Sequence, residues 1–442
     1  MKPMSDRATS DPGPTRRTFL AGAGAAAVAG LTAACADSAE PATTTAAAEV
    51  AQPENAAAPE PTAAAPALAA VEAVAFGGAR QQGVLAPVTA AGLVASFDVL
   101  VDSRADLAST LQDLSQEVDR IMSGEPPTSV ESHLPPVDSG AVDRTTSTRG
   151  TAITLGVGAS LFDDRFGLAD RRPSELIAMP RFRNDRLVRP ELSDGDLALT
   201  ITGPSQQSVV YALHQAVRVT DRRLRLRWVQ EGYNDLLPPS PDRVAPTRNL
   251  MGFHDGSSNI DTTDAAAMQE HVWVSADNGE PAWAVGGTYQ AVRIIRMFIE
   301  FWSTAALVRQ EQIFGRHRDT GAPLGQSTEA EEPAFGTDAS DEGVPRRSHM
   351  RLANPRTSDT ALLLRRGFSY LNGVDVTSAT MDQGLLFTCY QRSLNRGFLA
   401  TQARLDGEPL EDYIKPVGGG LFFVLPGPGT GADAWLGESL LS

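Results

Sequence analysis

Cysteine is almost absent from this chain of 442 residues, which contains only Cys35 and Cys389. Cys35 lies at the end of a segment that we expect to be removed or modified, so Cys389 would remain alone and no disulfide framework is expected. The chain also has no Walker loop, no HExxH or CxxC motif and no glycine fingerprint for nucleotides after a strand. These absences exclude the enzyme classes that such motifs define.

Positive charge is scarce as well, and the formal net charge of the chain is −16. Residues 1–35 contain more basic than acidic side chains, so the chain without them is more acidic still. Phosphate backbones repel a surface of this sign, and we therefore expect no nucleic-acid partner.

Histidine pairs at metal-chelating spacing are also missing, because the six histidines are scattered along the chain. A metal site with a single histidine remains, and haem iron is commonly held in that way. On composition alone this is one option among several. The three glycines of "VGGGLFF" (417–423) precede an apolar strand. They favour a turn with close backbone packing over a nucleotide-binding loop.

The N-terminus has the basic, apolar and small segments of an export signal. "TRRTFL" (15–20) leads into the run "AGAGAAAVAGLTAACADSA", and a twin arginine ahead of a modest apolar stretch is typical of the Tat route. We predict a Tat signal at 1–35, the Tat translocase as partner during export, and an extracellular or cell-envelope location. The apolar run is short for a membrane span.

The sequence "LTAAC" loosely resembles a lipoprotein processing site with Cys35 as the lipidated residue. Thr32 stands where such sites usually have a branched apolar residue. Simple cleavage near Cys35 and lipid anchoring both stay open, and membrane contact is expected only if Cys35 carries lipid.

Beyond the signal, residues 36–73 are rich in Ala, Pro and Thr and predict a tether that cannot bury enough apolar surface to fold. The order of alternating and helical patterns after residue 74 is strand, helix, strand, strand, helix and a last strand at "RLRLRWV". This is the order of a ferredoxin-like unit. A related rhythm follows, with strands near "ALLLRRGF" (361–368), "GLLFTCYQ" and "LFFVLP". We predict two α+β units, 74–240 and 241–442.

Four motifs in order carry a family resemblance: "GFHDG" (252–256), "SHMRLANPR" (348–356), "LLRRGFSY" (363–370) and "EDYIKPVGGGLFFVLPG" (411–427). Together they resemble the dye-decolourising peroxidase family, in its Tat-exported branch, from about Leu155 to the C-terminus. The resemblance implies an α+β fold of tandem ferredoxin-like units, of the dimeric α+β barrel type, that encloses haem b in the C-terminal unit.

Carried over by position, His349 resembles the metal ligand on the proximal side of the haem. Asp255 resembles the distal catalytic carboxylate, and Arg365 the distal arginine, although the adjacent Arg366 is an alternative. The further residues that the resemblance places against the cofactor are Gly256, Ser257, Ser258, Asn354, Pro355 and Arg356. His254 is expected to point away from the pocket, and His317 is a weaker rival for the ligand.

The resemblance implies an exported haem b peroxidase that uses hydrogen peroxide to oxidise dyes, phenolic compounds or metal ions. Asp255 would move a proton between the two peroxide oxygens, and Arg365 would stabilise negative charge on the leaving oxygen, so that both assist heterolysis of the O–O bond. A carboxylate suits this task in mildly acidic solution, where a histidine base would already be protonated. The chain could also form a homo-oligomer.

One departure from the family concerns the proximal side. The family tends to have an aspartate after the "YQR" stretch, thought to bond the proximal imidazole, and here Ser393 occupies that place. A neutral partner would weaken the imidazole as a donor and raise the iron potential. The rival functions are a haem or iron acquisition protein of the cell envelope, similar to a deferrochelatase with little peroxidase turnover, and a cofactor-free adhesin or solute binder.

Overall fold

The structure is a computed structural model that describes residues 72–125, 133–137, 139–142, 148–240, 243–335, 343–357, 360–431 and 433–442. The predicted Tat signal at 1–35 and all but the last two residues of the predicted tether at 36–73 lie outside the described residues. The folded part that carries the candidate site is contained in the second compact unit, Leu68–Ser442.

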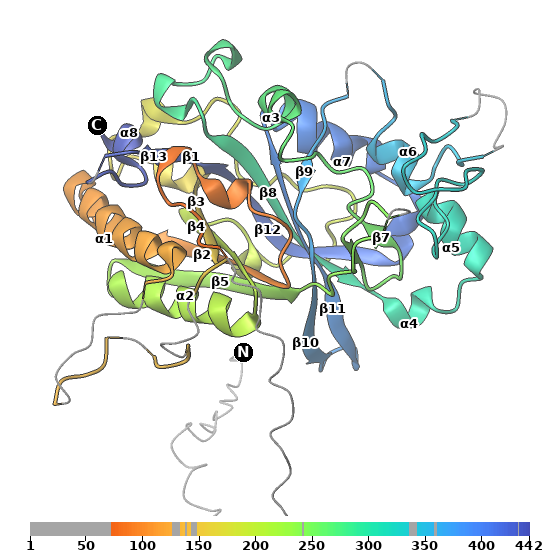
Figure 1. Ribbon diagram of the computed structural model, residues 1–442, viewed down its shortest axis with the longest axis horizontal. Coiled ribbons are helices and arrows are strands. Elements are labelled where there is room, and N and C mark those ends of the chain that lie inside the picture. Colours follow the sequence, from red (N-terminus) through yellow and green to blue (C-terminus); the bar gives the residue numbers. More distant parts are fainter. Residues whose placement is uncertain are drawn as a thin grey trace, which may run out of the picture. The chain divides into compact units, whose positions relative to one another are not determined.

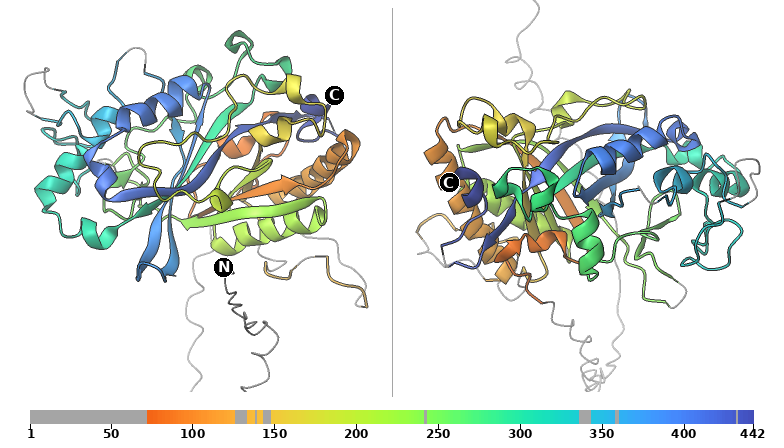
Figure 2. Two further views of the ribbon diagram at one scale, coloured as in Figure 1. Left: turned by 180° about the vertical axis from the view of Figure 1, so that it is seen from behind. Right: turned by 90° about the horizontal axis from the view of Figure 1, so that it is seen from above.

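Strands from both halves of the sequence join into one closed ring (Figures 1 and 2). Around the ring the order is β5, β2, β4, β3, β12, β8, β11 and β10, and β10 pairs back to β5. The bounds are β2 (Ala91–Val99), β3 (Ala152–Gly158), β4 (Leu197–Gly203), β5 (Leu224–Tyr233), β8 (Thr288–Met297), β10 (Phe368–Asp375), β11 (Thr380–Gln391) and β12 (Ile414–Val424).

Short strands complete the sheets outside this ring. Strand β9 adds to the edge of β11, β6 pairs with β7, and β1 pairs with β13. Their bounds are β1 (Gly78–Arg80), β6 (Thr247–Arg248), β7 (His254–Asp255), β9 (Leu364–Arg365) and β13 (Pro426–Gly429).

Each half of the ring has the strand order of a ferredoxin-like unit. The first half runs β5-β2-β4-β3 and the second β12-β8-β11-β10, with antiparallel neighbours throughout. In each half the fourth strand along the chain lies beside the first, and the third and then the second strand follow. The predicted α+β fold of tandem ferredoxin-like units is therefore confirmed.

Two long helices belong to the first half, α1 (Arg104–Ser123) and α2 (Gln206–Val219). Ser103 accepts a hydrogen bond from the backbone N–H of Asp106 at the start of α1, and Gly124 ends it with a left-handed backbone (φ 75°). The remaining helices are α3 (Ala265–His271), α4 (Ile299–Trp302), α5 (Leu307–Phe314), α6 (His349–Ala353), a π-helix (Asn395–Leu399), α7 (Ala400–Leu405) and α8 (Glu438–Leu441). In the part of the chain that the structure describes, no helix is long and apolar enough to span a membrane.

Side chains alternate between the two faces of each ring strand. Both faces are largely buried in β2, β3, β4, β8 and β12, whereas β5 and β10 leave many residues exposed. One core cluster contains residues from seven of the ring strands, among them Val94, Ile294 and Leu386. Because it joins so many strands, this cluster lies inside the ring. The neighbours of these residues in the first half, such as Leu93, pack outward against α1 and α2. The outward face of the second half is covered by α6 and α7 instead, and the candidate site lies there.

Close packing at the seam between the halves depends on glycine. The ring of Phe368 on β10 lies against Gly92, the Cβ of Phe368 lies against Gly232, and a Cβ at either glycine would collide with Phe368. Asn234 also donates hydrogen bonds to the carbonyls of Thr89 and Gly367, at 3.2 and 3.1 Å. These contacts join β10 to β5 where only one residue pair, Ser369 with Tyr233, is in register.

Two local predictions are wrong. Of the segment 361–368, only Leu364, Arg365 and Phe368 are in strands, because the hairpin strand is β10 and starts at Phe368. The glycines 418–420 lie within strand β12 and form no turn. Their close backbone packing is present, since a Cβ at Gly418 would collide with the carbonyl of Leu192.

Candidate functional site

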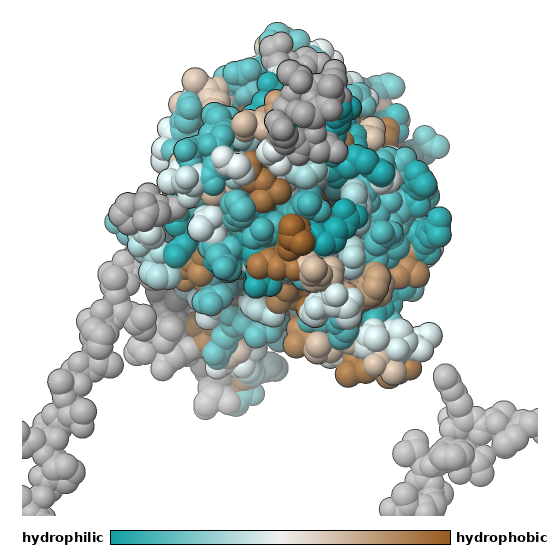
Figure 3. Space-filling model, turned by 90° about the vertical axis from the view of Figure 1, so that its right-hand side faces the viewer, coloured by the Kyte–Doolittle hydropathy of each residue, from teal (hydrophilic) through white to brown (hydrophobic). Residues whose placement is uncertain are grey.

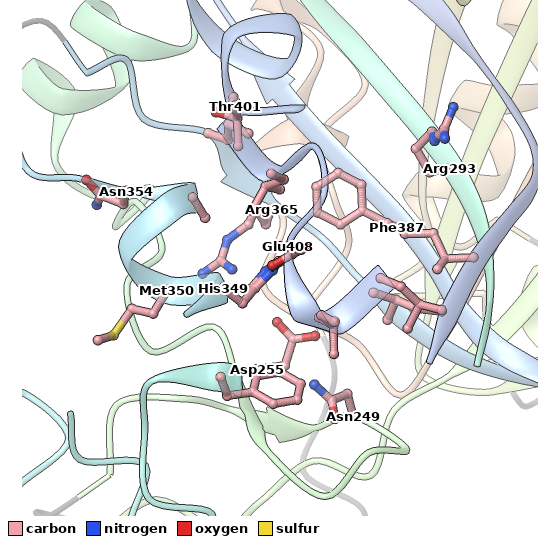
Figure 4. Close-up of a pocket in the computed structure, with 18 of the residues that line it drawn as sticks. Asn249, Asp255, Arg293, His349, Met350, Asn354, Arg365, Phe387, Thr401 and Glu408 are labelled. Atoms are coloured by element: carbon pink, nitrogen blue, oxygen red, sulfur yellow. Dashed lines mark hydrogen bonds and ion pairs between the residues drawn. The ribbon is translucent and has the colours of Figure 1, made fainter. Parts of the chain in front are cut away.

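A cavity of 270 Å³ lies between the outer face of the second half-sheet and helices α6 and α7. Strands β8, β11 and β12 supply one wall, because every second residue of each strand points outward. The apolar part of the lining includes Ile295, Met297, Leu363, Leu385, Phe387 and Ile414. Figure 4 shows Asp255, His349 and Arg365 close together on one side of the cavity, whereas Arg293 lies on the strand side near Phe387.

His349 is the first residue of α6 and points into this cavity (Figure 4). Its Nδ1 lies 3.0 and 2.9 Å from the two carboxylate oxygens of Glu408, whose side chain is only 4% exposed. This bond fixes the orientation of the ring and leaves Nε2 for a ligand in the cavity. Burial alone would lower the pKa of His349, but the Glu408 carboxylate outweighs burial and the pKa lies above its ordinary value.

The ring is enclosed by protein, yet 32% of the His349 side-chain surface is accessible, because it borders the empty volume of the cavity. A histidine held by a buried carboxylate and facing a large cavity is arranged as a metal ligand rather than as a core side chain.

Asp255 lines the same cavity from strand β7. Pairing of Thr247 with Asp255 holds the short β6–β7 ladder, and glycines with left-handed backbone flank it at Gly252 (φ 89°) and Gly256 (φ 104°). Other residues rarely adopt these angles, so the bracketing glycines are needed for the turn that directs Asp255 inward. In Figure 4 the Asp255 carboxyl group faces the space shared with His349 and Arg365.

The neighbouring His254 also belongs to the lining of the cavity, contrary to the prediction that it points away, but its ring is buried against Glu329. Its Nδ1 lies 3.1 Å from a carboxylate oxygen of Glu329, and the two side chains are 4% and 0% exposed. Glu329 also accepts hydrogen bonds from the backbone N–H of Val244 at 2.8 Å and the Ser257 hydroxyl at 2.5 Å. Burial would raise the pKa of Glu329, but these donors and His254 hold it below its ordinary value. Glu329 thus fixes the loop around Asp255.

The side chain of Arg365 enters the cavity from β9. Asn259 forms hydrogen bonds with both backbone groups of Arg365. The Asn259 amide donates to the carbonyl of Arg365, and its oxygen accepts from the Arg365 N–H, both at 2.8 Å. Arg366 points elsewhere: its guanidinium donates to the carbonyl of Ala86 at 2.9 Å, and burial lowers its pKa. The structure therefore places Arg365 in the cavity and Arg366 outside its lining.

Two further arginines border the same end of the cavity. The hydroxyl of Ser258 accepts from Arg316 at 3.0 Å and from Arg356 at 3.4 Å. Arg356 also pairs with Glu332. Burial lowers the pKa of Arg316 to about 10, and the neighbouring Arg356 and Arg365 act in the same direction. This cluster of cations suits an anionic group at that edge of the cavity.

Most of the predicted site residues line this one cavity. They are Asp255, Gly256, Ser257, Ser258, His349, Asn354, Arg356 and Arg365. Pro355 is not part of the lining, and neither is His317, whose ring is 41% exposed and lies 3.3 Å from Glu311. Pattern reasoning missed Glu408, Glu329 and Arg316, since no motif spacing connects these residues to the histidines or to Ser258.

Family models match nearly the whole of the part of the chain that carries this site. The Dyp-type peroxidase N-terminal model matches residues 81–234, and the Dyp-type peroxidase C-terminal model matches residues 246–428. The chain belongs to the Dyp-type peroxidase family. It is accordingly a haem peroxidase, and haem is its cofactor.

Individual relatives cover similar lengths. The chain is 45% identical to a deferrochelatase of Escherichia coli O157:H7 over 370 residues, which cover 83% of this chain and 86% of the relative. Ferric DtpA from Streptomyces lividans has 32% identity and a TM-score of 0.75, with 84% of this chain and 97% of that chain covered. A DyP-type peroxidase from Cellulomonas bogoriensis has 29% identity and a TM-score of 0.71 over 84% and 98%.

The ligand residue and the lining of this peroxidase's cavity suit haem. One imidazole is oriented by a buried carboxylate, which is the arrangement that favours a single axial nitrogen ligand. The apolar wall of β8 and β11 suits the porphyrin, and the cation cluster at Ser258 suits its carboxylate substituents.

The prediction of a neutral partner for the proximal imidazole is wrong. Ser393 donates to both carboxylate oxygens of Glu175 at 2.9 Å, and His349 is bonded to Glu408. Glu408 comes from the 3₁₀-helical region after α7, 59 residues along the chain from His349. An anionic partner strengthens the imidazole as a donor, so the expectation of a raised iron potential loses its basis.

Proposed function

We propose that this chain is an exported haem b peroxidase that reduces hydrogen peroxide and oxidises dyes, phenolic compounds or metal ions. The observation that carries the proposal is the convergence of Asp255, Arg365 and the Glu408-bonded His349 on one cavity. These three side chains come from β7, α6 and β9, and β7 is distant in the sequence from the other two.

His349 would hold the cofactor through Nε2, and Glu408 would keep the proton on Nδ1. When bound, haem supplies an iron with an open position for peroxide and the redox chemistry that reduces it. Arg316, Arg356 and Ser258 would hold its carboxylate groups.

Asp255 and Arg365 would act on the peroxide itself. The Asp255 carboxylate would take a proton from the peroxide oxygen that lies nearer the haem. It would return this proton to the more distant oxygen, which leaves as water. The Arg365 guanidinium stabilises the negative charge that develops on that more distant oxygen. A positioned proton shuttle of this kind contributes roughly 10²- to 10⁴-fold in rate.

Export by the Tat route is part of the same proposal, and it rests on the twin arginine and the weakly apolar run within 1–35. The mature protein would act outside the cytoplasm or in the cell envelope, with a lipid anchor only if Cys35 is modified. A homo-oligomer is also proposed, without a defined interface.

A second candidate function is favoured by the relatives named deferrochelatase at 45% identity. In that case the chain would release iron from haem and turn over little peroxide. It would use the same His349 and would not need Asp255.

The two functions are separated by peroxide-dependent dye bleaching with haem-loaded wild type and Asp255→Ala. The peroxidase proposal expects the variant to lose roughly 10²- to 10⁴-fold in the rate with peroxide. An unchanged trace, together with fluorescence from metal-free porphyrin, would favour iron release and contradict the peroxidase. Asp261→Ala, an exposed carboxylate six residues further on, is the matched control.

A further inference from the structure

A second cavity of 160 Å³ adjoins the candidate haem cavity. It lies between the loop 179–194, strand β12 and the end of β5. Arg293 on β8 belongs to the lining of both cavities. Arg293 and Asp185 are buried at its base, whereas Arg181 and Arg227 are exposed and border its opening.

Two of the three arginines at this second cavity are paired with a carboxylate, and Arg181 is the third. Arg293 pairs with Asp185, and Arg227 pairs with Asp98 at 3.1 Å. The Arg181 guanidinium donates to the backbone carbonyls of Asp185 and Val188, at 3.4 and 3.3 Å. Among the described residues no carboxylate forms an ion pair with Arg181. The Nε of Arg293 is buried and has no hydrogen-bond partner there either.

Asp194 limits the charge that the second cavity can take. Its carboxylate lines the cavity and accepts from the Met179 N–H at 3.1 Å. Burial raises its pKa, against the opposing effect of that bond and of Arg227 and Arg181. Arg293 is paired with Asp185 and Arg227 with Asp98, so Arg181 and Asp194 are the two charged lining residues without an ion pair among the described residues. A carboxylate monoanion can bind Arg181, whereas Asp194 would repel a phosphate dianion more strongly.

The rest of the lining is apolar or flat. Val188 and the prolines 180 and 190 form the sides. Gly418 and Gly419 present backbone only, and a Cβ on Gly419 would collide with the carbonyl of Val292. A cavity of about 150 Å³ admits one benzene ring. The volume of 160 Å³ therefore gives room for one aromatic ring, and the glycine backbone leaves a flat surface for it.

We propose that this second cavity binds a single-ring aromatic carboxylate, with its carboxylate on Arg181 and its ring between Val188 and the Gly418–Gly419 backbone. Planar carboxylates bind arginine through two parallel hydrogen bonds, which a small spherical anion cannot form. A neutral phenol lacks the charge that Arg181 recognises.

The inference deepens the proposed peroxidase function and rests on it, because it names a class of electron donor. A hydroxybenzoate in the second cavity would lie beside Arg293. The Arg293 side chain belongs to the walls of both cavities and separates the hydroxybenzoate from the haem cavity. Two hydroxybenzoates each lose one electron and one phenolic proton, and together these reduce one hydrogen peroxide to two waters. The products are two phenoxyl radicals, which leave the cavity.

Binding is tested by calorimetric titration of benzoate, which is not oxidised at the ring, into the haem-loaded protein without peroxide. We expect one site, a Kd weakened about tenfold or more in Arg181→Met, and little change in Arg172→Met, an exposed arginine outside the lining. Val188→Phe fills the ring space without changing charge and should abolish binding. Equal binding to Arg181→Met or to Val188→Phe would overturn the proposal, as would phosphate binding as tightly as benzoate.

Turnover supplies the second readout. The KM for 4-hydroxybenzoate should rise about tenfold in Arg181→Met while kcat and the KM for an uncharged phenol stay unchanged. A parallel rise for both donors would contradict a carboxylate site. Absence of peroxide turnover with every donor would defeat the proposed function, yet benzoate binding would still be measurable, so the two failures are distinguishable.

Discussion

At the scale of single residues, the choice between two adjacent arginines is the sharpest question. Arg365 lines the cavity and Arg366 donates to the carbonyl of Ala86. We expect Arg365→Leu to slow the peroxide-dependent change of the Soret band by about 10²- to 10³-fold, the usual effect of removing a group that stabilises developing charge. Arg366→Leu should cost stability but change this rate far less. Stopped-flow spectra in which Arg366→Leu slows this change more than Arg365→Leu would contradict the assignment.

Glu408 is the second test at this scale. In Glu408→Gln the acceptor for Nδ1 of His349 becomes a neutral amide, so the imidazole becomes a weaker donor. We expect a higher reduction potential of the iron and an activity loss of about 10- to 100-fold. Potentiometric titration measures the first effect. The control is Asp412→Asn, an exposed carboxylate in the same short helix. A potential equal to that of wild type would show that Glu408 does not act through His349.

Individual residues also mark the limit of what sequence reasoning predicts. His349, Asp255 and Arg365 could be named because they stand in contiguous motifs. Glu408 and Glu329 could not, because each acts through a hydrogen bond to a residue more than 50 positions away. The place expected for the proximal carboxylate holds Ser393, which binds Glu175 instead. Local sequence carries no signal for such long-range partners.

At the scale of elements, the β6–β7 turn is held by one buried carboxylate. Glu329 accepts from Val244 and Ser257, lies 3.1 Å from His254, and has a pKa below its ordinary value. A lowered pKa contributes stability above the unfolded-state value near 4.3, and this contribution is lost as the pH falls through the folded-state pKa.

We therefore expect Glu329→Gln to lower the free energy of unfolding by about 2 kcal/mol at pH 7, or Tm by roughly 2–3 °C. The difference from wild type should shrink as the pH falls below about 4. Thermal unfolding of the haem-loaded proteins between pH 3 and 7 measures both effects. A difference that stays constant over this range would mean that the charge of Glu329 contributes nothing.

Elements also differ in how far their patterns could be interpreted. The alternation in β2, β3 and β4 and the helical spacing in α1 and α2 were sufficient to predict the first unit, since one face of each is buried. The strand pattern of the second unit was harder to interpret, because the outward face of its strands borders a cofactor cavity and includes polar residues such as Arg293. The segment 361–368 has the pattern of one apolar strand. Its residues are instead divided among strand β9, the lining of the cavity and the seam between the two halves of the ring.

At the scale of the whole molecule, the predicted export depends on residues outside the described part of the chain. The proposal expects that Arg16→Lys with Arg17→Lys blocks Tat export and leaves haem-loaded protein in the cytoplasm. Cell fractionation with an absorption spectrum of each fraction measures this outcome. Secretion of the double variant at the wild-type level would contradict the Tat route.

One side of the folded part is mostly hydrophilic. Figure 3 looks onto the side that carries α4, α5 and α6, where hydrophilic side chains dominate and apolar ones gather in small groups. The exposed apolar residues of α4 and α5 are Phe301, Leu307 and Val308. Groups of this size are usual on soluble proteins and define no partner.

Haem binding by this protein should depend on a single imidazole, that of His349. The Soret spectrum is recorded during haem titration of wild type, His349→Ala and the control His317→Ala. We predict one haem per chain with the same Soret band for wild type and His317→Ala, and loss of tight haem binding for His349→Ala. Full occupancy with an unchanged Soret band in His349→Ala would contradict the central claim.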